Sequence, residues 1–522
     1  MNHFTTLDEA AARGMSVAFQ AKRHPERIAI LSPRGNRTYA ELNRRANQVV
    51  HLLRAAGVEA GDGLALLSRN RPEFAEVFFA CQRAGLRLTP VNWHLGNDEI
   101  AYIVKDSGAV ALVADAALAG AARSAAELSD TLVVKLQLGE AVEGFDTYGR
   151  AIAAMPDDDI DDPVLGDTML YTSGTTGQPK GVRRAMPEPA KAVEGMNLLS
   201  AVFGFDADGN DTALATGPLY HSGPIHLCLS IPVNAGIPTI LMERWKAEEM
   251  LRLIDEHAVT HTYCVPTMFS RLLAVPESTR RAYDVSSLRF LIHGAAPCPV
   301  EDKRAIIDWF GPIVTEIYAA TEGMGTLVSS QEWLEKPGTV GRPAPDAVRI
   351  LDERGRPLDV GEIGTVFIRP LAGGDFEYWG APEKTRDAIR DGYFTVGDLG
   401  TIDADGYLFL TGRSAEVIIS GGSNIYPAEI DDILSQHPAV ADGVAFGAAD
   451  DDWGEVVHAA IVANAGEESS QQLADTLLAD YANALPTYKQ PRRIHFVDAI
   501  PRNEAGKIVR RKLRDRFGGF ET

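Results

Sequence analysis

Along the first hundred residues, short apolar runs alternate with stretches whose apolar positions repeat at helical spacing. Residues 28–31 and 64–67 are apolar runs typical of buried strands. Between them, apolar side chains recur on one face of a predicted helix: Leu42, Ala46, Val49, Val50 and Leu53. Thr38 stands three residues before Glu41, which predicts a capping box at the start of this helix, and Gly57 is a suitable stop.

The alternation continues as far as residue 171. A surface helix is expected over 7–21 and a second helix over 73–84, and a strand is expected to begin at Leu86. Residues 164–171 are expected to form one more strand, which leads into a polar, glycine-rich loop. Strands that alternate with helices in this way predict an α/β fold with largely parallel sheets.

Size and charge narrow the class of protein. The chain has 522 residues, of which 45% are hydrophobic and 23% are charged, so it is an ordinary globular sequence with two or more expected domains. The net charge of -22 argues against a nucleic-acid partner. Residues 489–522 are locally basic, with about ten Lys and Arg against about four Asp and Glu. This tail is either a solvated helix face or a surface that attracts a nucleotide or coenzyme A.

The cysteines indicate a reducing compartment. Cys81, Cys228, Cys264 and Cys298 are far apart and show no CxxC spacing, which argues against a zinc site or a disulfide framework. There is no run suited to a signal peptide and no apolar stretch of about 20 residues, so no transmembrane segment is expected. Cytoplasmic localisation is the default expectation.

The loop at 171–181 reads YTSGTTGQPKG and has the composition of a phosphate clamp. Glycines let the backbone approach a ligand, successive amides can form an anion nest, and the hydroxyls and Lys180 add donors and charge. The glycine-to-lysine spacing differs from that of a Walker P-loop, and no Ser or Thr follows Lys180. Composition alone leaves open a second interpretation, a mobile turn between a strand and a helix.

The loop resembles the phosphate-loop signature of the adenylate-forming (ANL) superfamily, which includes acyl-CoA synthetases. Four further stretches are similar to that family and follow in the family's order: YAATEG at 318–323, YFTVGD at 393–398, GR at 412–413 with SGGSNIYP at 420–427, and PRNEAGK at 501–507. Five matches in order cover most of the chain.

The resemblance implies a large N-terminal multi-sheet α/β domain and a small mobile α+β C-terminal domain. The expected boundaries are 1–411 for the first domain, 412–415 for the hinge and 416–522 for the second, swinging domain, which carries Lys507. The chain departs from the family at Ala415, where Lys or Asp is usual, and at Glu416, where Asp is common. A small hinge residue is compatible with a change in backbone torsion.

The resemblance also implies the site. The expected catalytic residues are Lys507, Glu322 and Thr172, and the last two are also the expected metal ligands. The residues expected to bind ATP or AMP are Thr172, Ser173, Gly174, Thr175, Thr176, Gly177, Lys180, Gly294, Ala295, Ala296, Glu316, Ile317, Tyr318, Ala319, Ala320, Thr321, Asp398 and Arg413. The expected acyl pocket consists of Tyr220, His221, Met268, Gly323 and Met324. The expected CoA tunnel consists of Ser420, Gly421 and Gly422, and the expected hinge residue is Ala415.

The activity implied is ATP-dependent carboxylate–CoA ligation through an acyl-adenylate, with ATP, Mg²⁺ and coenzyme A. A carboxylate attacking a phosphate brings two anions together, so donors and cations must offset their repulsion. Gly323 and Gly325 are expected to leave a roomy pocket, which favours a medium- or long-chain fatty acid or a bulky ring-bearing carboxylate. The expected partners are therefore small molecules, with a homodimer possible.

Three other functions stay open at the level of sequence. The chain could be an adenylating enzyme that loads an acyl group on a separate carrier protein. It could be a luciferase-like oxygenase, which shares the adenylation half. It could also be a non-catalytic nucleotide or acyl-CoA sensor, against which the retained Lys507, Glu322 and phosphate loop argue.

Overall fold

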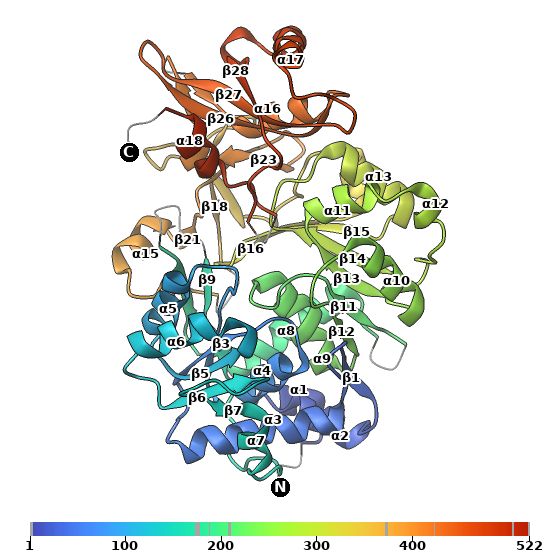
Figure 1. Cartoon of the computed structure of the whole chain (residues 1–522), viewed down its shortest axis with the longest axis vertical. Helices are drawn as coiled ribbons and strands as arrows, with labels where there is room; N and C mark the ends of the chain where they lie inside the picture. Colours follow the sequence, from blue (N-terminus) through green and yellow to red (C-terminus); the bar gives the residue numbers. More distant parts are fainter. Residues whose placement is uncertain are drawn as a thin grey trace.

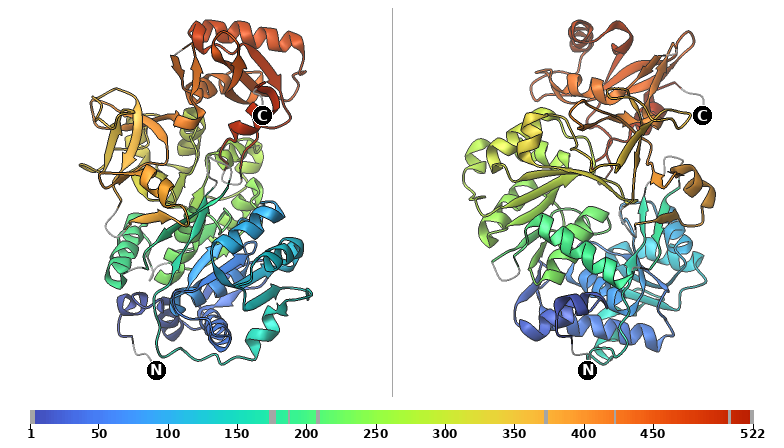
Figure 2. Two further views of the ribbon diagram at one scale, coloured as in Figure 1. Left: turned by 90° about the vertical axis from the view of Figure 1, so that its left-hand side faces the viewer. Right: turned by 180° about the vertical axis from the view of Figure 1, so that it is seen from behind.

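The computed structural model describes residues 4–172, 178–186, 188–206, 210–370, 374–421, 423–503 and 506–519. The predicted site residues Ser173, Gly174, Thr175, Thr176, Gly177 and Gly422 lie outside the described residues. The molecule is elongated, with the N-terminus at one end and the last hundred residues, orange to red, at the other (Figure 1). Two further views show the same end-to-end arrangement (Figure 2).

Two large sheets form the N-terminal part of the described chain. The eight-stranded sheet has the order β16 (Met324–Val328), β15 (Val314–Ala319), β14 (Phe290–Gly294), β13 (His261–Cys264), β11 (Ala213–Ala215), β12 (Thr239–Leu241), β1 (Ile28–Leu31) and β2 (Arg37–Thr38). The six-stranded sheet has the order β7 (Asp146–Thr147), β6 (Val134–Leu138), β5 (Ala109–Asp115), β3 (Gly63–Leu67), β4 (Arg87–Pro90) and β8 (Asp167–Thr168). The pairing is parallel except at edge strands β2 and β16, which confirms the predicted α/β class.

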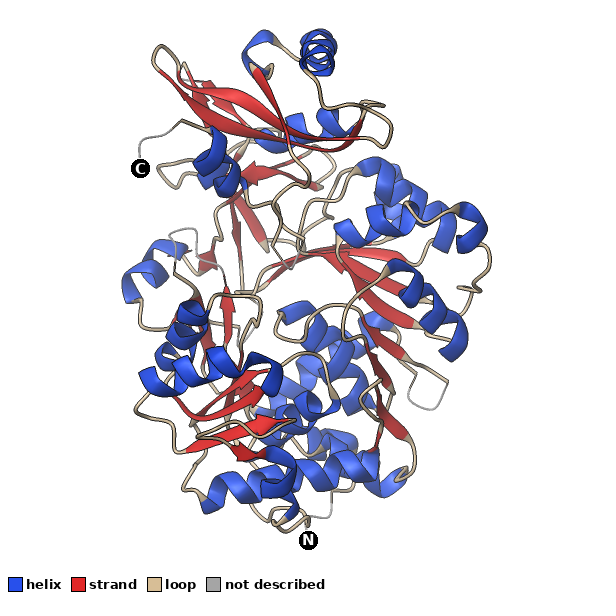
Figure 3. Cartoon of the chain, in the orientation of Figure 1, coloured by secondary structure: helices blue, strands red, loops and turns tan. Residues whose placement is uncertain are grey.

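Helices cover these sheets on both sides (Figure 3). The helices of the large domain are α1 (Leu7–Ala11), α2 (Ser16–Arg23), α3 (Tyr39–Ala55), α4 (Pro72–Ala84), α5 (Asn97–Asp106), α6 (Ala119–Leu128), α7 (Tyr148–Ala153), α8 (Pro189–Phe203), α9 (Ile231–Ala235), α10 (Ala247–His257), α11 (Pro266–Leu273), α12 (Glu277–Arg280), α13 (Val300–Phe310), α14 (Ser330–Glu335) and α15 (Pro382–Ala388). Helix α4 contacts β1 of one sheet and β3 and β4 of the other. It therefore fills the space between the sheets, and Phe74, Phe78 and Phe79 are buried there.

Two smaller sheets carry the parts of the chain that later form the site. The three-stranded sheet has the order β19 (Phe376–Tyr378), β10 (Lys180–Arg184) and β9 (Leu170–Thr172). The next sheet has the order β20 (Ile389–Arg390), β21 (Tyr393–Phe394), β18 (Gly364–Ile368), β22 (Asp398–Ile402) and β23 (Leu408–Arg413), with β17 (Val348–Leu351) on β18. Residues from the two sheets share one core, in which Val182 lies with Tyr318 and Phe394.

The C-terminal domain is built around a long antiparallel hairpin. Its sheet has the order β25 (Ser423–Ile425), β24 (Ile418–Ser420), β27 (Gly454–Ala463) and β26 (Val440–Asp450), with β28 (Arg493–Phe496) parallel to β27. Its helices are α16 (Pro427–Ser435), α17 (Gln471–Ala484) and α18 (Arg510–Phe517). A separate core of its own buries Ile430, Leu477 and Ile461, as an independently packed α+β unit requires.

Several local predictions are confirmed and two are wrong. Thr38 and Glu41 form the predicted capping box, and α3 ends two residues before Gly57. The single helix expected over 7–21 is instead α1 and α2. The break has a physical reason: Gly14 has a φ of 68°, and a side chain there would meet the backbone of Gln82 in α4. The strand expected over 164–171 is split because β8 pairs with β4 while β9 pairs with β10 of another sheet.

The four cysteines are free thiols, as expected. Cys81, Cys228 and Cys264 are buried and Cys298 is half-buried. Burial raises the pKa of all four thiols, that of Cys228 to about 12. Each therefore stays protonated near neutral pH. Among the described helices, none combines the length and the apolar run needed to span a bilayer.

Candidate active site

The phosphate loop connects two antiparallel strands. Thr172 at the end of β9 pairs with Lys180 at the start of β10, so the loop leaves and re-enters the sheet at the same place. A turn between a strand and a helix, the second interpretation of this loop, is therefore wrong. Thr172 and Lys180 therefore stand opposite each other at the base of the loop.

Glu322 is held by a tyrosine that the sequence did not single out. The hydroxyl of Tyr378 donates to Oε1 of Glu322 at 2.8 Å, and both side chains are buried. The ammonium of Lys180 lies 4.9 Å from the centre of the same Tyr378 ring. Burial, with the nearby Lys384, lowers the pKa of Lys180, and the charge of Glu322 opposes this. Tyr378 thus links the lysine at the base of the loop to the candidate metal ligand.

The carboxylate of Glu322 fits Mg²⁺ better than a transition metal. Among the described residues, no group of three or more His, Cys, Asp or Glu side chains could hold a metal ion. Mg²⁺ is usually bound through one or two carboxylates, with phosphates and water supplying the remaining oxygens. A single buried carboxylate near the base of a phosphate loop meets that requirement.

Asp398 and Arg413 form a pair where two neighbouring strands meet. They are opposite each other on β22 and β23, and Nε of Arg413 donates to Oδ1 of Asp398 at 3.0 Å. The hydroxyl of Tyr318 donates to the other oxygen of Asp398 at 2.9 Å. Asp398 is thereby fixed with its carboxylate against the strand that carries the YAATEG motif. This arrangement suits a carboxylate that accepts hydrogen bonds from a ribose diol.

Lys507 of the C-terminal domain is half-buried and faces charged residues of the large domain. Burial and the charge of Arg413 together lower the pKa of Lys507 to about 8, although the charges of Asp398 and Glu322 act in the opposite direction. Its loop is seated on α11, because a side chain at Gly506 would come within 2.7 Å of Oγ1 of Thr267. The structure therefore brings Lys507 together with the predicted residues from three other motifs, which lie between 94 and 185 residues earlier in the chain.

His221 lies close to Lys507 on the acyl side. Burial lowers the pKa of His221 to about 4, and the charges of Lys507 and His94 act in the same direction. Its Nε2 has no hydrogen-bond partner among the described residues. The adjacent Tyr220 is fixed by a 2.9 Å hydrogen bond between its hydroxyl and Nδ1 of His94. Met268 is buried on α11, next to the threonine that contacts the Lys507 loop.

The predicted adenine pocket lies where β14 and β15 run side by side. Gly294 pairs with Ile317, and a side chain at Gly294 would meet the backbone oxygen of Ile317 at 2.5 Å. The carboxylate of Glu316 is occupied elsewhere, since Nζ of the buried Lys303 donates to it at 2.5 Å. The remaining predicted residues of this pocket lie in the same two strands or in the turns that follow them: Ala295, Ala296, Tyr318, Ala319, Ala320 and Thr321.

The expectation that Gly323 and Gly325 leave a roomy pocket is wrong. A side chain at Gly323 would meet the Phe394 ring at 2.8 Å, and one at Gly325 would meet the Tyr318 ring at 2.7 Å. The volume that each glycine frees is thus filled by an aromatic ring from another strand. The size of the substrate cannot be argued from these two glycines.

The predicted tunnel residues Ser420 and Gly421 lie at the end of β24 in the C-terminal sheet, and the predicted hinge residue Ala415 precedes that sheet. Gly421 has a φ of 54°, its amide donates to the backbone oxygen of Trp453 at 2.8 Å, and a side chain on it would meet the Trp453 ring. Ser420 is buried on β24. Ala415 lies in a 3₁₀ turn, Ser414–Glu416, directly after β23. Glu416 accepts from Nη1 of Arg510 at 2.7 Å, so the end of the hinge is tied to α18.

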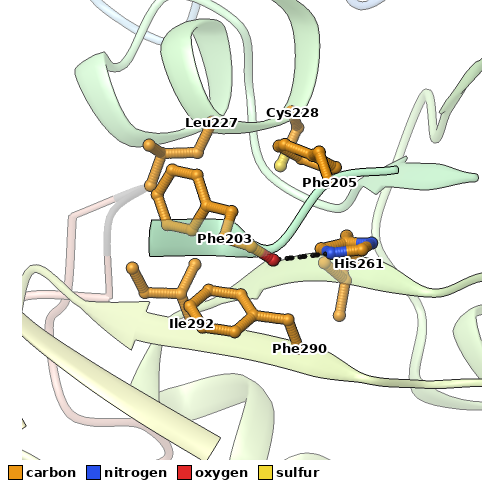
Figure 4. Close-up of a pocket in the computed structure, with 8 residues that line it drawn as sticks. Phe203, Phe205, Leu227, Cys228, His261, Phe290 and Ile292 are labelled. Carbon is orange, nitrogen blue, oxygen red and sulfur yellow. Dashed lines mark hydrogen bonds between the residues drawn. The ribbon is translucent and has the colours of Figure 1, made fainter. Parts of the chain in front are cut away.

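A small apolar pocket contains none of the predicted acyl residues in its lining. It is lined by the end of α8, by β13 and β14, and by a π-helical segment, Pro224–Ser230. Figure 4 shows His261 among aromatic rings in this pocket, with Nε2 at 2.8 Å from the backbone oxygen of Phe203. His261 is therefore a core histidine with its hydrogen bond satisfied.

Comparison with known proteins agrees with this geometry. The family model for the AMP-binding enzyme matches residues 17–371, and the model for the AMP-binding enzyme C-terminal domain matches residues 429–507. The chain is 34% identical to the fatty acid–[acyl-carrier-protein] ligase ScoC of Streptomyces coeruleorubidus, over 97% of this chain and 96% of that one. It is also 34% identical to a feruloyl-CoA synthase of Amycolatopsis sp., over 96% and 98% of the two chains.

A solved structure extends the agreement to three dimensions. The o-succinylbenzoate CoA synthetase MenE of Bacillus subtilis, in complex with the acyl-adenylate intermediate OSB-AMP, superimposes with a TM-score of 0.80. It is 27% identical, and the match covers 97% of this chain and 99% of that one. The chain belongs to the AMP-binding enzyme family within the adenylate-forming superfamily, as an AMP-forming acyl-CoA ligase whose reaction uses ATP, Mg²⁺ and coenzyme A.

Proposed function

We propose that the residues gathered around Lys507 carry out the adenylation of a carboxylic acid. The observation that supports this most directly is the position of the half-buried Lys507, whose charge interacts with those of Asp398, Arg413 and Glu322. Asp398 and Arg413 hold the ribose hydroxyls, the base of the phosphate loop holds the phosphates, and Glu322 with Thr172 holds Mg²⁺. Tyr220, His221 and Met268 border the acyl group.

In the first step, a carboxylate oxygen attacks the α-phosphorus of ATP, a P–O bond forms, and the bond to pyrophosphate breaks. Both reactants are anions, so a cation between them stabilises the transition state. The Lys507 ammonium supplies that charge, and Mg²⁺ neutralises charge on the phosphates. In the second step, the CoA thiolate attacks the acyl carbon, the thioester forms, and AMP leaves with the electron pair of the broken C–O bond.

We propose CoA as the acceptor and a medium- or long-chain fatty acid or a ring-bearing carboxylate as the acid, in line with the names of the fatty acid and feruloyl ligases that the chain resembles. A separate carrier protein is the second candidate, favoured by the similarity to an acyl-carrier-protein ligase. Pyrophosphate release with a panel of acids tests adenylation, and AMP release that depends on added CoA tests the acceptor. Pyrophosphate release without CoA-dependent AMP release would favour the carrier protein. Failure of every acid in the panel to release pyrophosphate would contradict the proposed choice of acid.

We also propose that the two domains change their relative orientation between the steps, about the segment 412–415. Lys507 would withdraw, and Ser420, Gly421 and Gly422 would move to line the path of CoA. Support comes from the separate C-terminal core and from the exposed turn at Ala415. We further propose that the protein forms a homodimer, which analytical sedimentation tests. We also propose a cytoplasmic location, which cell fractionation tests.

Limited proteolysis is expected to cut the chain first between residues 412 and 416. Ser414 and Ala415 are exposed, and each flanking domain has its own core. Mass spectrometry of the first fragments locates the cut. A first cut elsewhere, with 412–416 resistant, would contradict the proposed domain boundary.

The adenylation rate is expected to depend on the protonation of Lys507. Burial lowers the pKa of Lys507 to about 8 in the free enzyme, so kcat/KM for ATP should fall as the pH rises through about 8. Bound ATP is anionic and stabilises the ammonium, so the corresponding fall in kcat should occur at a higher pH. Lys507→Arg keeps a positive charge at every pH tested and should remove the alkaline fall. If the fall in rate at alkaline pH persists in Lys507→Arg, it is caused by the titration of a group other than Lys507.

Tyr378→Phe is expected to raise the Mg²⁺ concentration needed for half-maximal pyrophosphate release by about 10-fold or more. The change removes the hydrogen bond to Glu322 but keeps the ring beneath Lys180, and hydrogen bonds to charged groups contribute about 1.5–3 kcal/mol. Tyr393→Phe is the control, because the Tyr393 hydroxyl bonds Asp346 instead. An equal effect in both variants would show that loss of a buried hydroxyl, not its contact with Glu322, is responsible.

A further inference from the structure

Arg510 is a buried arginine that joins three parts of the C-terminal domain. It begins α18 and stands three residues after Lys507. Its Nε donates to the backbone oxygen of Ala445 in β26 at 3.0 Å, and its Nη2 pairs with the carboxylate of Asp431 in α16. Its Nη1 donates to Oε2 of Glu416, the last residue of the turn after β23, at 2.7 Å. Because a guanidinium presents its donors in a rigid planar fork, these partners hold it in one orientation.

The turn that ends at Glu416 is anchored to the large domain at its other end. The amide of Ser414, its first residue, donates to the backbone oxygen of Gly397 at 2.9 Å. Ser414 also follows directly on β23, which pairs with β22 of the large domain. Ala415, which is exposed, therefore stands between a residue held by the large domain and a side chain held by the C-terminal domain.

The contact between Glu416 and Arg510 shortens the connection between the two domains. The next residue of the chain that belongs to the core of the C-terminal domain is Ile418. Without the contact, the segment 415–417 would link the anchored end of the turn to that core. Every residue contributes two soft backbone torsions, so holding Glu416 in place confines most of the rotation to Ala415.

The loop that carries Lys507 moves with the C-terminal sheet as one body. The Lys507 amide donates to Oδ1 of Asn503 at 2.9 Å, which closes the loop on itself. Nη2 of Arg502 lies 3.0 Å from both carboxylate oxygens of Asp442 in β26, which ties the loop to the sheet. The freedom of Lys507 relative to the large domain is therefore the freedom of the segment 415–417.

We propose that Glu416 and Arg510 are a pair of positioning residues for adenylation, whose contact confines rotation to Ala415 and so places the Lys507 ammonium accurately. They act through Lys507 and not on the substrate. A displacement of about 1 Å at a reacting centre can cost about 10²-fold in rate. In the second step the C-terminal domain only lines the path of CoA, so that step tolerates a looser connection. The inference rests on the proposed function, which assigns Lys507 to the first step.

Glu416→Asp tests the pair without removing a charge. It shortens the side chain by one methylene group and breaks the contact with Arg510, which keeps its bonds to Asp431 and Ala445. The carboxylate stays, and its charge raises the pKa of Lys507. Pyrophosphate release should slow by about 10–10²-fold, measured with octanoate or ferulate, whichever the wild-type protein uses faster. Thioester formation from the supplied acyl-adenylate and CoA should change far less.

Glu455→Asp is the matched control. Glu455 also accepts from an arginine of α18, since Nη2 of Arg514 donates to it at 2.9 Å, but it stands on β27 and not in the turn. Its shortening should leave pyrophosphate release unchanged. Arg510→Lys should slow pyrophosphate release as Glu416→Asp does. The double variant should be no slower than the slower single variant, because either change breaks the same contact. Thermal melting shows whether each variant is folded.

A second measurement needs no acid substrate. Subtilisin should cut the segment 414–417 faster in Glu416→Asp than in the wild-type protein, because the loosened segment is longer, and Glu455→Asp should be cut at the wild-type rate. The proposal is overturned by an unchanged cutting rate in Glu416→Asp or by unchanged pyrophosphate release. Equal loss of both half-reactions, or an equal loss in Glu455→Asp, would also overturn it.

Lys507→Ala, measured in parallel, tests the proposed function separately. If Lys507→Ala releases pyrophosphate at the wild-type rate, the role of Lys507 is wrong, and the inference that Glu416 and Arg510 position it falls with it. If Lys507→Ala loses pyrophosphate release while folded Glu416→Asp keeps it, the proposed function stands and only the positioning role is wrong.

Discussion

Lys507→Ala is expected to slow pyrophosphate release with the acid substrate by about 10²–10³-fold, the usual cost of removing one electrostatic donor from a transition state. It should still convert a supplied acyl-adenylate and CoA into the thioester. The reason is that Lys507 is proposed to act only while the α-phosphate is attacked, in the orientation in which it lies beside Asp398 and Arg413. The two half-reactions are measured separately by pyrophosphate release and by thioester formation.

Two further variants make this prediction specific. Lys512→Ala removes an exposed lysine of α18 and should leave both steps unchanged. Gly422→Leu should behave in the opposite way to Lys507→Ala, releasing pyrophosphate while failing to form the thioester, because a bulky side chain would narrow the path of CoA. Residues that act as a unit lose both steps together. Equal loss of both half-reactions in folded Lys507→Ala and Gly422→Leu would exclude the two-orientation mechanism.

The second large effect is expected from Glu322→Gln, which should lower the adenylation rate by more than about 10²-fold at limiting Mg²⁺. Loss of a residue that merely supports a metal ligand typically costs about 10–100-fold, so loss of the ligand charge itself should cost more. Glutamine keeps the volume and can still accept from Tyr378, so the change isolates the charge. Pyrophosphate release is measured across Mg²⁺ concentrations, and high Mg²⁺ should restore part of the rate.

Glu335→Gln, an exposed carboxylate on α14, controls for the change in net charge. It should leave the Mg²⁺ requirement unchanged. An unchanged rate at limiting Mg²⁺ in Glu322→Gln would mean that Glu322 is not a metal ligand. A loss that no concentration of Mg²⁺ relieves would instead point to a role of Glu322 in folding of the turn.

Local patterns predicted the parts of the fold that depend on neighbouring residues. The capping box at Thr38 and the apolar runs of β1 and β3 were identifiable, because a few consecutive residues determine a helix cap or a buried strand. The break between α1 and α2 at Gly14 could not be identified from the sequence, because it depends on contact with the backbone of Gln82 in α4. The split of the strand expected over 164–171 was not identifiable either, because it depends on the pairing of β8 with β4 and of β9 with β10.

In the candidate site, too, the sequence predicted the residues of the motifs but not the contacts made by residues from distant strands. The motifs placed Glu322, Asp398, Arg413 and Lys507 in the chain, and the fold brings them together. Tyr378 lies 56 residues from Glu322 in the sequence, and an aromatic residue in a buried strand reads as core packing. The glycine argument failed for a related reason, since Phe394, which fills the space above Gly323, comes from a distant strand. Free volume is a tertiary property that no local composition reveals.

The burial of the four cysteines has a consequence for experiments on this protein. Thiol–disulfide exchange and alkylation both require a thiolate, and burial with a raised pKa suppresses it at Cys81, Cys228, Cys264 and Cys298. We therefore expect adducts to form slowly when the enzyme is kept in a high concentration of its thiol co-substrate or of that thiol's oxidised dimer. A cysteine introduced on the exposed face of α18 would be the preferred target of a fluorescent maleimide, and so a clean optical reporter of where the C-terminal domain points.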